Sequence, residues 1–157
     1  MSVAEQVKAY QEELVNLGRD REDIVVCDPD YNKMNVPFAQ EFPDRYYQFG
    51  VAEANAVCFA AGLALTAKTP FVNAFSMFNV GRVFDQIRQS IALQHLNVKL
   101  IGSHAGFSNA SDGATHQCLE DLALIRVLPN MTVLTPADAA EMVRAVRWAS
   151  EYEGPVY

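Results

Sequence analysis

The segment from residue 104 to residue 117 contains most of the side chains that are suited to chemistry. It reads HAGFSNASDGATHQ and places His104, Asp112 and His116 among small and polar residues that a packed core would not require. Histidine donates or accepts hydrogen bonds, and aspartate accepts them from hydroxyl groups. The segment therefore suits a wall that binds a polyol. It lacks the H-E-x-x-H and Cys/His spacings of metal centres, so we expect no metal site in it.

Glu53 is a second candidate, and the residues alone leave two interpretations open. It lies at the start of a stretch, residues 52–64, that is rich in Ala and Gly, whose small side chains let another backbone approach closely. A glutamate in the first turn of a helix is favoured by the helix dipole and is commonly exposed. Alternatively, Glu53 lies in an apolar pocket covered by a partner. There the charged form is disfavoured and the carboxyl can hand a proton to a ligand nitrogen.

Phe75 and Phe78 are spaced i, i+3 at the point where a strand is expected to meet a helix. Most such pairs pack in a core. At the ligand edge of a sheet they would instead stack on a flat heteroaromatic ring, which contributes about 1 kcal/mol beyond the burial of area. Both interpretations are open from the residues.

These side chains need a scaffold that brings them together, and the hydrophobic pattern predicts one. Continuous apolar runs predict buried strands at residues 24–27, 46–49, 70–75, 98–103, 131–134 and from 155 onward. Periodicity predicts an amphipathic first helix that has a Ser2–Glu5 capping box and ends at Gly18. It predicts four more helices, at residues 51–68, 78–96, 116–127 and 137–151. This order indicates an α/β fold, a three-layer αβα sandwich with a mostly parallel sheet.

The order of strands and helices also predicts where the candidate residues lie. In an open parallel sheet, ligands bind at the carboxyl ends of the strands. Phe75 ends an expected strand, and Asp30, Glu53, Phe78 and His104 come shortly after the end of one. We therefore expect them to converge on one edge of the sheet.

Composition restricts the function further. A length of 157 residues suits a single domain, and a formal net charge of −7 opposes nucleic-acid binding through a basic face. The chain has no apolar run near the ~20 residues that span a bilayer, and its acidic start is unlike a signal peptide. The cysteines, Cys27, Cys58 and Cys118, are odd in number and widely spaced, as in a reducing compartment. We expect a cytoplasmic protein with buried, inert thiols and no membrane partner.

Several motifs in the right order resemble the pyrimidine-binding domain of transketolases. They are FPDRYYQFGVAE at residues 42–53, Gly81-Arg82 and DQIR at 81–88, DGATHQ at 112–117, and LPNMTVLTPAD at 128–138. The resemblance runs from about residue 25 to residue 157. It implies one pyrimidine-binding domain over residues 1–157, cut before a C-terminal domain. The helix-first start resembles the C-terminal chain of split, two-subunit transketolases.

The resemblance implies a thiamin diphosphate site shared between chains. Glu53 takes the position of the glutamate that hydrogen-bonds the aminopyrimidine nitrogen and promotes removal of the thiazolium proton. Phe78, with Phe75 behind it, takes the position that stacks on the pyrimidine. Asp30 lies near an acidic position that faces the cofactor. Glu53 is thus implied as catalytic and cofactor-binding, and the other three as cofactor-binding.

For the substrate, the resemblance implies that His104, Asp112 and His116 line the channel and bind the hydroxyls of the donor sugar, with both histidines catalytic. It implies a transferase that moves a two-carbon ketol unit between sugars or sugar phosphates. The chain lacks the G-D-G motif with an Asn-bearing loop that holds metal and diphosphate. We therefore expect Mg or Ca on a diphosphate-binding partner subunit, a homodimer or heterotetramer, and no activity of this chain alone.

Two departures from the family pattern bear on the substrate. Ser111 stands where transketolases usually carry Glu, and Tyr31-Asn32-Lys33 departs from a Ser/Thr-rich pattern. These departures argue against assigning an ordinary pentose phosphate as the substrate and leave a modified sugar as an alternative. Three alternatives share the fold: a β-type chain of 2-oxo acid dehydrogenases, a deoxyxylulose-phosphate synthase fragment and a non-catalytic interaction module. The loop from Asp112 to His116 favours transketolase.

Overall fold

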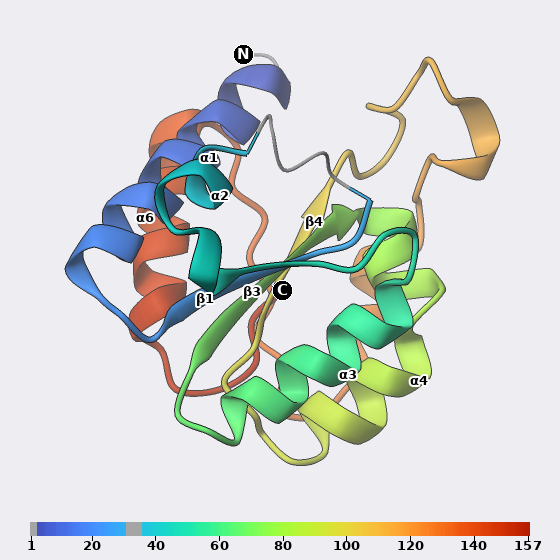
Figure 1. The fold of residues 1–157 in the computed structure, drawn as a ribbon. Helices are drawn as coiled ribbons and strands as arrows, with labels where there is room; N and C mark the ends of the chain where they lie inside the picture. Colours follow the sequence, from blue (N-terminus) through green and yellow to red (C-terminus); the bar gives the residue numbers. More distant parts are fainter. Residues whose placement is uncertain (1–2, 31–35) are drawn as a thin grey trace.

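Four apolar segments of the chain pair in parallel to form the central sheet (Figure 1). A computed structural model describes residues 3–30 and 36–157. The sheet has the order β2-β1-β3-β4, with Val26 of β1 paired to Tyr46 of β2 and to Phe71 of β3. The strands are β1 (Ile24–Asp28), β2 (Tyr46–Gln48), β3 (Thr69–Phe75) and β4 (Lys99–Ser103). Four of the predicted strands are thereby confirmed.

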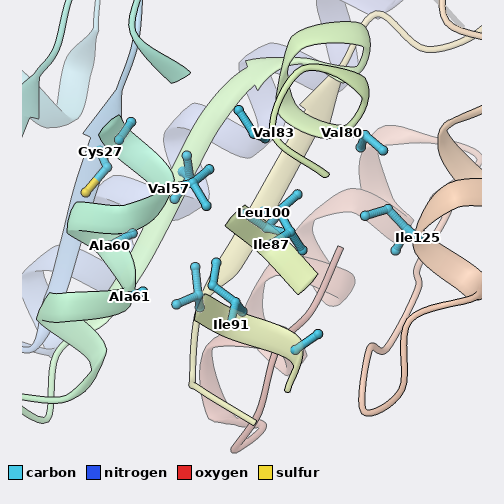
Figure 2. Close-up of a cluster of buried hydrophobic side chains, with 14 of the residues drawn as sticks. Cys27, Val57, Ala60, Ala61, Val80, Val83, Ile87, Ile91, Leu100 and Ile125 are labelled. Carbon is cyan, nitrogen blue, oxygen red and sulfur yellow. The ribbon is translucent and has the colours of Figure 1, made fainter. Parts of the chain in front are cut away.

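Helices cover both faces of this sheet, as Figure 1 shows. On one face, α1 (Val3–Asp20) and α6 (Ala139–Glu151) pack on side chains such as Val26 and Phe71. On the other, α3 (Glu53–Ala64) packs on alternate strand residues, among them Cys27, which Figure 2 shows, and Val72. Because successive strand side chains point to opposite faces, an all-apolar strand needs two covers. The predicted three-layer sandwich is confirmed.

The strands predicted at residues 131–134 and from 155 onward are wrong in extent. Only isolated parallel bridges form there: Val156 pairs with Lys99 of β4 and, on its other side, with Thr132. The Val156 N–H donates to the Val98 carbonyl and the Leu100 N–H to the Val156 carbonyl. Pro155 has no N–H to donate, which limits the pairing that this segment can make.

The first helix runs two residues past Gly18, so the predicted end is wrong. A Cβ at Gly18 would lie 2.6 Å from Cε2 of Phe38 and 2.7 Å from Cε2 of Phe42. Gly18 therefore allows a close approach rather than ending the helix. Phe38 belongs to α2 (Pro37–Glu41), and Phe42 precedes the 3₁₀ turn η2 (Pro43–Arg45). The predicted capping box includes Ser2, which lies outside the described residues.

The predicted helix at residues 78–96 is interrupted and partly widened. It divides into the π-helical segment η3 (Met77–Gly81), α4 (Phe84–Gln86) and the π-helical segment η4 (Ile87–Ala92). The wide hydrogen bonds continue beyond η4, from Leu93 N–H to the Arg88 carbonyl at 3.0 Å. π-helical turns carry one residue more than an α-turn and concentrate at functional sites.

The region after β4 also differs from the prediction of a helix at residues 116–127. A 3₁₀ turn, η5 (Gly113–Thr115), precedes a shorter helix, α5 (Asp121–Arg126). Residues 116–120 are extended or turned, and Cys118 pairs with Gly106 through an isolated antiparallel bridge. The segment therefore folds back on itself as a loop beyond the sheet edge (Figure 1).

One side of α3 is largely apolar and only partly covered, by the contact of the Phe59 ring with Tyr47 of β2. Phe59 is 38% exposed, Leu65 is 69% exposed, and Val51 just before the helix is 66% exposed. Cys58 lies on this side and is exposed, so the prediction of three buried thiols is wrong for Cys58. The apolar composition of α3 predicts that every side of the helix is buried. In this chain the sheet covers only one side. Cys27 and Cys118 are buried, and burial raises the pKa of Cys27 to about 12.

Candidate cofactor and substrate site

Four of the predicted site residues form a group of rings at the carboxyl edge of the sheet, hereafter the ring group. Phe75 ends β3, and its ring centroid lies 4.7 Å from that of His104, which follows β4. Phe78 lies in η3, 5.0 Å from His116 between ring centroids, with their planes at 86°. Phe75 lies 6.4 Å from Phe78 and 6.2 Å from His116. The structure thus brings together residues that are up to 41 positions apart, as the topology predicted.

His104 is held in an unusual conformation within this group. Its backbone φ is +56°, a left-handed conformation that few non-glycine residues adopt and that concentrates at functional sites. Within the described residues its buried Nδ1 has no hydrogen-bond partner. Burial lowers the pKa of His104, and the nearby charge of Asp112 opposes that shift. A neutral imidazole with a free ring nitrogen can bind a hydroxyl group.

The loop residues differ in their contacts and in their exposure. His116 Nδ1 lies 2.9 Å from the hydroxyl of Thr115, which fixes the orientation of the ring. Asp112 and Ser111 are exposed in the loop before η5. Asp112 is therefore open to a ligand that approaches from outside the chain.

Glu53 begins α3 and is buried, with 3% of its side chain exposed. The interpretation of Glu53 as an exposed helix-start residue is therefore wrong. Its carboxylate accepts a hydrogen bond of 2.8 Å from Nη1 of Arg82, whose guanidinium carbon lies 4.5 Å from the centre of the Phe78 ring. Arg82 thus links Glu53 to the ring group.

Asp30 is the one predicted cofactor residue that no described contact connects to the ring group. It is exposed, has a φ of +72°, and its N–H donates to the Gly50 carbonyl at 3.1 Å. The Tyr31-Asn32-Lys33 segment, which bears on the substrate, lies outside the described residues.

Two polar residues of the site, Arg82 and Asp28, are not predicted from the sequence, although each carries a signal. Arg82 belongs to the motif at residues 81–88, and Asp28 directly follows an apolar run. Asp28 is 1% exposed and accepts a hydrogen bond of 2.9 Å from the Tyr46 hydroxyl, whereas its other carboxyl oxygen has no partner within the described residues. Burial raises the pKa of Asp28 to about 7, against the hydrogen bonds from Tyr46 and Asn73.

Asp28 and His104 both line a cavity of about 570 Å³ between α1 and the carboxyl edge of the sheet. Glu53, Phe78 and His116 do not line it. The cavity therefore adjoins the ring group at His104 and extends along the opposite face of the sheet from α3.

The side chains present suit one end of a cofactor. A buried carboxylate near the half-buried rings of Phe75 and Phe78 fits an aminopyrimidine ring. Among residues 3–30 and 36–157, no group of three or more His, Cys, Asp or Glu side chains is arranged to hold a metal ion. In the same described residues, no helix is both long and apolar enough to cross a membrane.

Comparison with known proteins agrees with this geometry. The family described as "Transketolase, pyrimidine binding domain" matches residues 4–157. A Methanocaldococcus jannaschii protein with the provisional name transketolase C-terminal section is 45% identical over 96% of this chain and 48% of its own length. The 6-deoxy-6-sulfo-D-fructose transketolase subunit SqwH of Clostridium sp. (strain MSTE9) is 38% identical over 94% of this chain and 47% of its own length.

A solved structure described as a split gene transketolase, inactive beta4 tetramer, superimposes with a TM-score of 0.88 and 47% sequence identity. The match covers 97% of this chain and 50% of that one. The chain therefore belongs to the family of transketolase pyrimidine-binding domains, and the resemblance seen in the sequence is confirmed. It spans about half the length of the relatives described above.

Proposed function

We propose that this chain supplies the pyrimidine-binding part of a thiamin-diphosphate-dependent transketolase-type transferase that moves a two-carbon ketol unit between sugars. One observation carries the proposal: a buried carboxylate, Glu53, lies beside the aromatic group of Phe78 at the ligand edge of the sheet. Membership of the transketolase family supports it.

In this proposal each residue has a defined task. Glu53 hydrogen-bonds the ring nitrogen of the aminopyrimidine and shares a proton with it, and Phe78 offers a ring face for stacking with Phe75 behind it. His104, Asp112 and His116 bind donor hydroxyls. Thiamin diphosphate, when bound, would supply an acidic thiazolium carbon as the nucleophile toward the ketose. Asp30 stays a proposed contact to the cofactor on the resemblance alone.

The diphosphate and its Mg or Ca ion are proposed to lie on a partner subunit. The apolar side of α3, formed by Val51, Phe59 and Leu65, is a surface for that subunit or for a second copy of this chain, since large exposed apolar patches mark interfaces. A homodimer or a heterotetramer would cover it. The related split gene transketolase is described as an inactive beta4 tetramer, which supports the association of such chains with one another.

The donor sugar is proposed from the exposed loop around Ser111 and Asp112. Ser111 removes a carboxylate that transketolases usually carry there, so the loop is less negative toward an acidic sugar. The name of the related subunit SqwH includes a sulfonated ketose. We infer that this chain accepts a modified or phosphorylated ketose, to be tested with both kinds of donor.

The proposal is tested by deuterium exchange at the thiazolium carbon in the assembled complex. Glu53→Gln keeps the size and one hydrogen bond but removes the acid, so exchange is expected to slow by about 10²- to 10⁴-fold while the cofactor still binds. Glu22→Gln, at an exposed residue after α1, is the matched control and is expected to leave exchange unchanged. Unchanged exchange in an assembled Glu53→Gln complex refutes the proposed role.

A further inference from the structure

Arg82 makes both contacts that the proposed function gives to the aminopyrimidine ring. Its Nη1 donates to Oε2 of Glu53 at 2.8 Å, and its guanidinium carbon lies 4.5 Å from the centre of the Phe78 ring. The guanidinium of Arg82 thus donates to the carboxylate of Glu53 and at the same time stacks on the ring of Phe78.

The chemistry of the two groups explains the coincidence. A guanidinium is flat and delocalised, donates N–H bonds in a fixed fork to carboxylates, and stacks on aromatic faces. The aminopyrimidine carries the same N–C–N unit and also bonds a carboxylate while stacking on a ring. We infer that Arg82 is a placeholder, which occupies the pyrimidine subsite in the cofactor-free chain and leaves it when thiamin diphosphate binds. This inference rests on the proposed function.

The burial of the two partners is unequal in the way a placeholder requires. Glu53 is 3% exposed, and a buried carboxylate without a partner is strongly destabilising, so Glu53 needs a cation beside it when no pyrimidine is bound. Arg82 is 47% exposed, and Glu53 is its hydrogen-bond partner within the described residues. The guanidinium can therefore return to water with one hydrogen bond lost, while the incoming pyrimidine takes over the carboxylate.

A placeholder has two measurable consequences of opposite sign. It stabilises the cofactor-free chain, because it pairs Glu53. It also weakens cofactor binding, because only the fraction of chains in which Arg82 has moved out is competent to bind. A residue that holds the cofactor directly would instead strengthen binding.

The experiment compares Arg82→Gln with Arg88→Gln in the complete assembly with the diphosphate-binding subunit. Arg88 is exposed and lies in η4, six residues after Arg82. Arg88→Gln therefore removes the same charge as Arg82→Gln but leaves the contact between Arg82 and Glu53 in place. Isothermal titration calorimetry measures the affinity for thiamin diphosphate with Mg²⁺, and for 4-amino-5-hydroxymethyl-2-methylpyrimidine, which lacks the diphosphate. For Arg82→Gln we expect both ligands to bind about tenfold more tightly than to Arg88→Gln.

The same variants are heated without cofactor. Arg82→Gln is expected to melt about 5 °C lower than Arg88→Gln. In the Glu53→Gln background that difference is expected to vanish, because no carboxylate is left to pair. Arg82→Lys keeps the charge without the planar fork, so its melting temperature is expected to lie close to that of the wild type. If Arg82→Gln does not fold, the binding measurements are made on Arg82→Lys instead.

The outcomes separate the two proposals. Equal or weaker binding of both ligands to Arg82→Gln, with the wild-type assembly binding thiamin diphosphate, overturns the placeholder and leaves the proposed function standing. Failure of the wild-type assembly to bind thiamin diphosphate overturns the proposed function itself.

Discussion

The buried carboxyl of Asp28 makes the stability of this fold depend on pH in an unusual direction. Burial raises its pKa from an ordinary value of 3.8 to about 7. Between these two values the folded chain keeps the proton and the unfolded chain has lost it. The folded state then binds more protons, so its free energy of unfolding falls as the pH rises through this window.

The size of this effect follows from the pKa. Each pH unit inside the window costs about 1.4 kcal/mol, so the total approaches about 4 kcal/mol by pH 7. Most domains have a total stability of about 5 to 15 kcal/mol, so the loss is a large share. Asp28→Asn keeps the shape and the hydrogen bond to Tyr46 but cannot ionise. The unfolding free energy of the variant is expected to lack this pH dependence, so the variant becomes more stable relative to wild type as the pH rises.

The assay is urea unfolding followed by circular dichroism at half-unit steps from pH 4.5 to pH 7.5. The quantity compared is the difference between the two unfolding free energies, in which other titrating groups cancel. It is expected to change by about 3 kcal/mol in favour of Asp28→Asn. Asp20→Asn, at the exposed end of α1, is the control and should show no such change. Parallel curves for Asp28→Asn and wild type would refute the reasoning.

Three further predictions follow from other contacts. Burial lowers the pKa of Lys99 to about 7, so the unfolded chain holds more protons between about pH 7 and 10; Lys99→Met should remove the resulting rise in unfolding free energy, measured by urea titration. In Gly102→Ala the new Cβ would overlap the hydroxyl of Tyr157, and calorimetry should show a loss of about 1 to 3 kcal/mol. Asp112→Ala or His116→Ala should slow ketol transfer by about ten- to a hundredfold with nearly unchanged cofactor affinity, and an equal loss of both would mark a structural role.

The sequence predicts the sheet well because strand burial has a simple signature. Runs such as residues 24–27 are apolar at every position, and only a sheet covered on both faces buries every one of them. The same logic brings Phe75 and His104 together at one edge. The rule fails for Gly18, since a glycine that ends a helix and one that admits Phe38 look the same in one dimension.

The site is less predictable because it depends on pairing rather than pattern. From its spacing Glu53 could be exposed or buried, because the spacing does not show that Arg82, 29 residues later, pairs with its buried carboxylate. The exposure of Cys58 is likewise not readable from the sequence pattern. Its helix is apolar on all sides, and composition does not say which side a sheet covers and which a partner covers. Asp30 stays a prediction, since nothing in the described structure tests its role.

The wide turn of η3 bears on how this site can change over evolution. A π-helical turn holds one residue more than an α-turn, so it absorbs an insertion without rotating the core residues that follow, such as Ile87 and Ile91. Gain or loss of a single residue between Phe78 and Arg82 then re-aims the guanidinium while the packing is kept. Length variants at this turn are therefore a route by which descendants of one fold can diverge in cofactor control, and alignments of such chains need separate registers before and after it.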